Sequence, residues 1–241
     1  MVHQVRGFSA PVHNLDVVNL YGEVALTVVD TEKVLSSADL TTPVFPSDSG
    51  ELIQLQSLNN SDTDLVLVYG LGTDFKYQDE LVKMNGTTPV QTTKTFTRVN
   101  RLDWTSKSAF LGEIAATSVG GGAAFRTLNV KAQLSIDAVY TIHADKTWQV
   151  DTIYSALTRD SNNTATGIVA VYYRPVGYAF RRPFKFPVAS RGNSSNNYIN
   201  LTPEIGPGPV DVYLTAEASD ASVGTPTEIV ARITMRMGQG A

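Results

Sequence analysis

The stretch Ile229-Val-Ala-Arg-Ile-Thr-Met-Arg-Met237 places an apolar side chain at every second position, with Arg232, Thr234 and Arg236 between them. Successive side chains of a strand point to opposite faces, so this period of two predicts a strand with one buried and one solvated face. The same alternation runs through residues 128–137 and 210–219. No stretch keeps a helical stripe for three turns, so the sequence predicts an all-β protein.

The division into domains is predicted from the middle of the chain. Three glycines, Gly120–Gly122, suit neither a strand nor a helix. The charge balance also changes there, because the first 120 residues carry 8 basic and 14 acidic side chains and the remaining residues carry 11 and 9. We expect two antiparallel β-sandwich or jelly-roll-like domains, residues 21–120 and 124–241, after an N-terminal arm of residues 1–20. A single larger jelly roll is the alternative.

The clearest turn signal is Asn85-Gly86, which lies between two strand-like segments. This dipeptide readily adopts the positive φ angles of a type I′ turn. The sequence therefore predicts a hairpin at this point.

The composition excludes several classes of protein. The 241 residues include no cysteine, which excludes disulfides and thiolate chemistry, and only 17% are charged. The net charge of −4 gives no general attraction for nucleic acid or for an anionic membrane. The longest apolar runs have five or six residues, far fewer than the ~20 of a membrane helix, and the N-terminus does not resemble an export signal.

Motifs that carry chemistry are weak. The chain has three histidines, and His143 is expected to lie partly exposed at a strand end. Gly70-Leu-Gly72 begins like a dinucleotide fingerprint but continues to Phe75, so we expect a strand end and a turn. Asp62-Thr-Asp64 and Asp160-Ser-Asn162 hold oxygen ligands without completing a calcium loop, and solvated loops are expected. We expect no catalytic residue, no metal and no cofactor, and we expect no enzyme.

The segment from Tyr172 to Phe186 is unusually rich in aromatic and basic residues. Such residues are enriched in protein–protein interfaces. A sandwich core, a glycan platform and a nucleic-acid platform use similar residues, although an acidic chain is a poor match for nucleic acid. We expect core packing together with a subunit interface, formed by the following residues: Tyr172, Tyr173, Arg174, Tyr178, Phe180, Arg181, Arg182, Phe184 and Phe186.

Three further segments resemble a pattern in small β-rich virion proteins of marine, cyanophage-like tailed bacteriophages. Residues 79–116 contain a glutamate-led strand, an Asn-Gly-Thr-Thr-Pro-Val turn and a Phe-Thr-Arg-Val-Asn-Arg strand in the same order. Residues 138–147 and 209–219 are similar to a Tyr-Thr-Ile-Pro-Ala-Gly-Lys-Thr segment and to a late Asp-Ile strand. The chain departs from the pattern at three positions: Glu113, His143 and Asp145.

The resemblance implies a non-enzymatic structural protein located in the virion and assembled in the host cytoplasm. It implies a capsid decoration, head-fibre or tail-associated subunit and supplies no functional residue. Such parts are symmetric oligomers, and we expect a trimer with other virion proteins, such as the major capsid protein, as partners. We expect the N-terminal arm to anchor the chain to the capsid through Val5, Phe8 and Val12.

A carbohydrate-binding module for a host surface glycan is the alternative function. Such a module presents exposed aromatic rings beside polar loop residues. Trp104, Trp148 and the loop at residues 192–198 are the candidates for this role.

Overall fold

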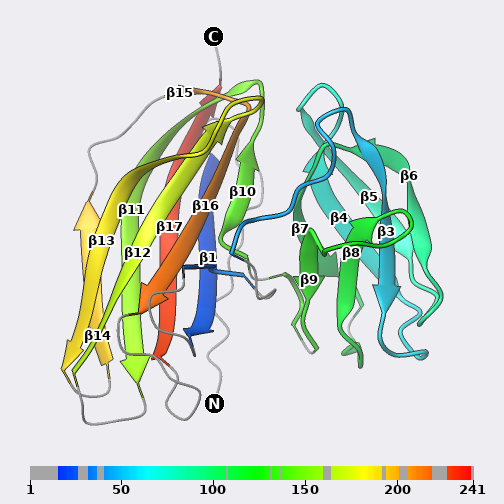
Figure 1. The fold of residues 1–241 in the computed structure, drawn as a ribbon. Coiled ribbons are helices and arrows are strands. Elements are labelled where there is room, and N and C mark those ends of the chain that lie inside the picture. The colour runs from blue at the N-terminus through cyan, green and yellow to red at the C-terminus, as the bar shows by residue number, and fades with distance from the viewer. Residues whose placement is uncertain are drawn as a thin grey trace.

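The computed structural model is an all-β protein built from antiparallel sheets, as the sequence predicts. It describes residues 16–26, 32–36, 41–106, 108–130, 132–135, 137–159, 164–191, 194–200, 206–218 and 227–239. Within these ranges the chain forms no α-helix, and so no helix that is long and apolar enough to cross a membrane. Two sandwiches lie side by side, a larger one on the left of Figure 1 and a smaller one on the right.

The large sandwich consists of two five-stranded sheets. The first has the order β1-β17-β11-β14, with β15 paired to β11, and the second has the order β10-β16-β12-β13, with β2 paired to β16. Its strands are β1 Asp16–Leu26, β2 Lys33–Val34, β10 Val139–Ile142, β11 Lys146–Arg159, β12 Thr164–Pro175, β13 Arg181–Arg191, β14 Ser194–Asn200, β15 Gly206–Pro207, β16 Val210–Ala218 and β17 Thr227–Gln239.

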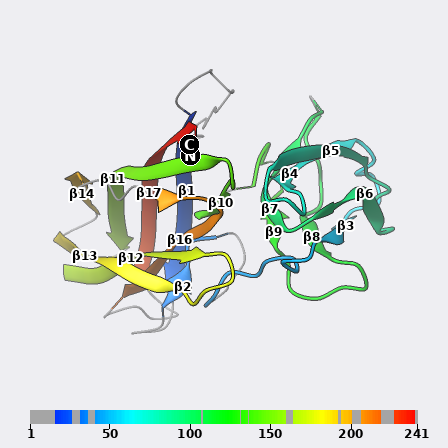
Figure 2. The ribbon, with the colours of Figure 1, turned by 90° about the horizontal axis from the view of Figure 1, so that it is seen from above.

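The small sandwich has a four-stranded sheet, β6-β3-β8-β9, and a three-stranded sheet, β5-β4-β7. Figure 2 shows the small sandwich from above, with these two sheets facing each other. Its strands are β3 Glu51–Ser57, β4 Leu65–Leu71, β5 Tyr77–Lys83, β6 Val90–Phe96, β7 Arg98–Trp104, β8 Ile114–Ser118 and β9 Arg126–Leu128. A separate apolar core fills each sandwich, with Ile233 and Leu214 fully buried in the large one and Phe96 and Leu102 fully buried in the small one.

The predicted domain boundaries are wrong. Strand β1 pairs along its whole length with β17, and β2 pairs with β16, so residues 16–26 and 33–34 belong to the large sandwich. The small sandwich is inserted between β2 and β10. Gly120–Gly122 form the turn between β8 and β9 inside the small sandwich, where their positive φ angles suit glycine. Long-range pairing of β1 with β17 leaves no local signal in the sequence.

Two of the three alternating segments differ from the half-buried strands that were predicted. The strand in residues 227–239 is half-buried as expected. In residues 128–137 the strand ends at Leu128, and the described residues that follow it belong to no further strand before β10. Strand β16 is buried on both faces rather than one. Residues 41–50, which precede β3 and are called the linker below, cover its second face together with the small sandwich.

The Asn85-Gly86 turn joins two sheets. Its flanking strands, β5 and β6, pair with β4 and β3 and belong to different sheets, so the expected hairpin within one sheet does not form. Thr88 N donates to Asn85 O, and φ is positive at Gly86 alone, which does not match a type I′ turn. The Glu80 carboxylate ties the two sheets together here, because it accepts hydrogen bonds from the backbone N–H groups of Thr93 and Lys94 on β6.

Candidate functional site

The two sandwiches meet at a buried ion pair. Arg98 begins β7 of the small sandwich and Asp211 lies in β16 of the large one, and both side chains are fully buried. Arg98 Nε donates to Asp211 Oδ1 at 2.7 Å and its Nη2 donates to Oδ2 at 3.1 Å, so the contact is bidentate. This planar geometry suits guanidinium and fixes the relative orientation of the two strands.

Two further donors from the large sandwich complete the coordination of Asp211. Thr141 Oγ1 donates to Oδ1 at 2.6 Å, and Arg174 donates from Nη2 to Oδ2 at 2.6 Å and from Nε at 3.1 Å. Both carboxylate oxygens therefore accept several hydrogen bonds, and this offsets the cost of removing the charge from water.

The other donors of Arg98 also have partners. Its Nη1 donates to Thr97 O at 2.5 Å, and its Nη2 donates to Asp48 Oδ1 at 2.7 Å. The guanidinium carbon lies 4.9 Å from the ring centroid of Phe45. Burial by itself lowers the pKa of Arg98, but the hydrogen bonds and charges of Asp211 and Asp48 outweigh burial and raise this pKa. The guanidinium is therefore charged at all ordinary pH values.

A second set of contacts lies beside the ion pair. Asn100 on β7 donates from Nδ2 to Thr141 O at 3.0 Å and accepts from Thr141 N at 2.8 Å. Arg126 on β9 is buried, donates from Nη2 to Val139 O at 3.0 Å and lies 3.8 Å from Asp137. Burial lowers the pKa of Arg126, against the opposing charge of Asp137. Four buried polar side chains, Arg98, Arg126, Thr141 and Asp211, together with the half-buried Asn100, thus join β7 and β9 to β10 and β16.

We call the contacts of β7 and β9 with β10 and β16 the junction. Part of the predicted interface segment packs inside the chain, against this junction. Tyr172 stacks on Tyr213 with ring centroids 4.9 Å apart, and Phe180 meets Tyr213 edge-on at the same distance. The Arg174 guanidinium lies over the Phe180 ring at 4.2 Å, and Phe45 of the linker lies within 6.4 Å of Phe180. Cation–π contacts and aromatic pairs of this kind each contribute roughly 0.5–1.5 kcal/mol.

The remaining residues of that segment divide into three groups. Phe186 is buried in the large core, and Tyr173 packs against it. Tyr178 is 70% exposed and Arg181 is exposed, so their expected role in a subunit interface stays a prediction. The side chains of Arg182 and Phe184, and the proposed anchor residues Val5, Phe8 and Val12, lie outside the described residues.

Three other expectations need correction. His143 is buried, not partly exposed, because its ring packs between Tyr77 and Tyr140. Asp62 is no solvated loop residue, since its buried carboxylate accepts from Ser57 Oγ and from two backbone N–H groups of the loop before β8. Trp104 and Trp148 are only 6% and 5% exposed, so they cannot stack on a sugar. Within the described ranges, no cluster of His, Asp and Glu could hold a metal ion.

Sequence reasoning missed Arg98, Asn100, Thr141 and Asp211 as a group. Asp211 lies in the polar phase of an alternating strand, which normally faces water. The one available signal was the neighbouring Tyr213 and Thr215 in that same phase, because a large aromatic residue favours a covered face.

Comparisons with known proteins do not identify the chain. No family model and no curated protein matches it. Among solved structures, a structure of infectious bursal disease virus, Gx strain, covers 95% of this chain and 77% of that chain at 10% identity, with a TM-score of 0.26. A tandem CBM22-1–CBM22-2 domain from Paenibacillus barcinonensis Xyn10C covers 90% and 94% at 8% identity, with a TM-score of 0.27. Scores this low carry no argument about function.

The substitution Asp211→Asn tests the junction. It keeps the shape of the side chain but removes the charge that Arg98 and Arg174 share, and an uncompensated buried charge typically costs about 3–5 kcal/mol. We expect the free energy of unfolding in urea to fall by that amount. Asp151→Asn is the matched control, because it breaks the surface pair with Arg236 and should cost about 0–1 kcal/mol. Equal effects of the two substitutions would contradict the role given to Asp211.

The alkaline limit of stability is set in part by three tyrosines. Burial, followed by the nearby Glu23, raises the pKa of Tyr21 to about 12, and burial is also the main cause of the raised pKa values of Tyr77 and Tyr213. Above pH ~10, the unfolded chain loses these protons first, so the free energy of unfolding should fall as the pH rises from 10 toward 12. Absorbance titration at alkaline pH should show that the phenols of Tyr21, Tyr77 and Tyr213 titrate late in the folded protein and normally in urea. Ten tyrosines titrating together in the folded protein would contradict this expectation.

Proposed function

We propose that the chain is a non-enzymatic structural protein of a tailed-phage virion, in the form of a capsid decoration, head-fibre or tail-associated subunit. In this role it assembles as a symmetric oligomer and binds other virion proteins, such as the major capsid protein. Its task is to hold a fixed shape under load, and it needs no reactive group.

One observation supports the proposal more than any other. The three segments that resemble virion proteins of marine phages contribute Arg98 and Asn100, Thr141, and Asp211. These side chains come from distant parts of the sequence and meet in one hydrogen-bonded cluster. A chance likeness in composition has no reason to select residues that bond to one another, so the resemblance points to a shared two-sandwich architecture.

The departures from the resembling pattern also fit this view. Glu113 and Asp145 are exposed and lie outside the strands, and His143 directly follows β10. Changes at such positions alter loops and leave the contacts of the junction in place.

Two of the three candidate sugar-binding sites of the alternative carbohydrate-binding function, Trp104 and Trp148, are buried. Trp104 donates its indole N–H to Ser108 O and packs against Phe110, and Trp148 packs against Tyr173. The third candidate, residues 192–198, is not the expected loop, because residues 194–200 form strand β14 and pair with β11. The side chains of these residues lie outside the described residues.

Mass spectrometry of gradient-purified particles of the phage that encodes this sequence tests the proposal. We expect peptides from both sandwiches in the particles, at a constant ratio to the major capsid protein after a high-salt wash. The phage's own replication proteins serve as the control and should be absent. Peptides found in the infected cells but not in the particles would overturn the proposal.

A further inference from the structure

Strand β4 is apolar on both faces. Val66 and Val68 point into the core of the small sandwich and are fully buried. Leu65, Leu67 and Tyr69 alternate with them and therefore lie on the outer face of the sheet β5-β4-β7. The central strand of an antiparallel sheet whose outer face meets water normally alternates apolar and polar residues. A second apolar row on β4 therefore indicates a covered outer face.

The neighbouring strand extends this apolar surface. Leu81 on β5 lies directly opposite Leu67 in the register, and Tyr77 lies on the same face of β5. The exposed fractions are 55% for Leu81, 50% for Tyr77 and 38% for Leu65. Large apolar side chains that are contiguous on one sheet and remain exposed mark an interaction surface. We call this surface the Leu81 face, and define it as the outward side chains of β5, β4 and β7.

Tyr77 gives the Leu81 face a rigid border. Its ring stacks on His143 at 5.7 Å and lies 6.1 Å from Tyr69, and its hydroxyl donates to Asp79 Oδ2 at 3.0 Å. An aromatic side chain that is already held in place loses little conformational entropy when a partner binds. The border is therefore preorganised for contact.

The charges on β5 point to the identity of the partner. Asp79 and Lys83 lie on the same face as Leu81, one on each side of it, at about 7 Å along the strand. Consider a two-fold axis that lies in the plane of the interface and crosses β5 at a right angle, level with Leu81. Rotation by 180° about this axis places Lys83 of one copy over Asp79 of the other, and the symmetry forms this contact twice. The charges on β7 satisfy each other, because Arg101 and Asp103 form an ion pair at 2.7 Å.

We propose that the Leu81 face is a two-fold interface, on which a second copy of this chain packs face to face with β5 antiparallel to β5 of its partner. Sheets pack in this way with their strands within about 30° of each other. The biological role of this interface rests on the proposed function, because the interface would be a surface through which virion subunits join. It differs from the three-fold assembly predicted from the sequence.

The molar mass of the purified full-length chain in solution, measured by light scattering across a concentration series, tests the proposal. We expect twice the chain mass of 26.0 kDa for the wild-type protein. Leu81→Asp should give a monomer, because it introduces two buried, facing charges. Leu58→Asp is the matched control, since Leu58 is 75% exposed but follows β3 in the opposite sheet, and this variant should remain a dimer.

A charge exchange tests the orientation without altering the apolar residues. Lys83→Asp should weaken the dimer by at least about tenfold, because like charges then face each other. The double variant Lys83→Asp, Asp79→Lys should restore most of the affinity. Circular dichroism checks that each variant is folded.

The outcomes are distinct from those of the virion experiment. A wild-type monomer, an oligomer that Leu81→Asp leaves intact, or a double variant that stays weak would overturn the two-fold interface. None of these results depends on whether the chain is present in virions. Peptides in the particles together with a monomer in solution would reject the interface and retain the proposed function.

Discussion

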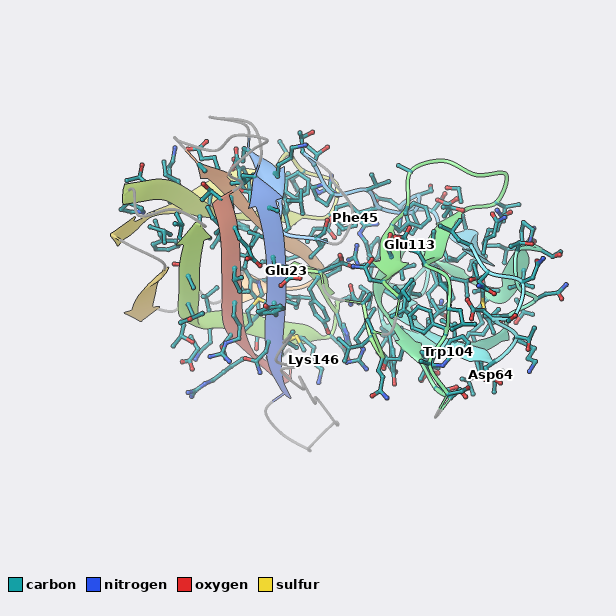
Figure 3. The ribbon with its side chains drawn as sticks, turned by 90° about the horizontal axis from the view of Figure 1, so that it is seen from below. Glu23, Phe45, Asp64, Trp104, Glu113 and Lys146 are labelled. Carbon is teal, nitrogen blue, oxygen red and sulfur yellow. The ribbon has the colours of Figure 1, made fainter. Side chains whose placement is uncertain are left out.

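The bidentate contact between Arg98 and Asp211 determines how the two sandwiches are placed. Removing both charges from water is costly, and the pair is tolerated because each remaining donor and acceptor has a partner: Arg174 and Thr141 on Asp211, and Asp48 on Arg98. Such a pair is sensitive to geometry, so it specifies one relative position of β7 and β16. Figure 3 shows the result from below, with side chains filling the space between the large sandwich and the small one.

Several other features of the molecule follow from this constraint. Strand β16 is buried on both faces because the junction covers the face that a free sandwich would expose to water. Both guanidinium groups lie over the ring of Phe45 in the linker, at 4.9 Å for Arg98 and 5.3 Å for Arg174, so this ring ties the connection between the sandwiches to the same cluster. The aromatic residues Tyr172 and Phe180 complete the packing around it.

The sequence predicted the fold class and the half-buried strand at residues 229–237, because alternation is a local property that the residues display directly. It did not predict that β1 joins β17, since pairing across more than 200 residues leaves no local trace. The polar cluster between the two sandwiches was not predicted from the sequence. Arg98 and Asp211 look like solvent-facing members of alternating strands, and their burial depends on which surface covers them. The segment around Phe180 stood out by its composition, but composition cannot distinguish an internal junction from a contact between subunits.

The central claim is that the two sandwiches fold as one unit, and urea unfolding of the variant Trp148→Phe tests it most directly. The substitution weakens the large core and leaves Trp104 as the only tryptophan, within the small core. If the junction couples the sandwiches, the fluorescence of Trp104 and the far-UV circular dichroism of the whole chain should follow a single transition with one midpoint. Two resolved transitions, with Trp104 reporting only the later one, would contradict the account.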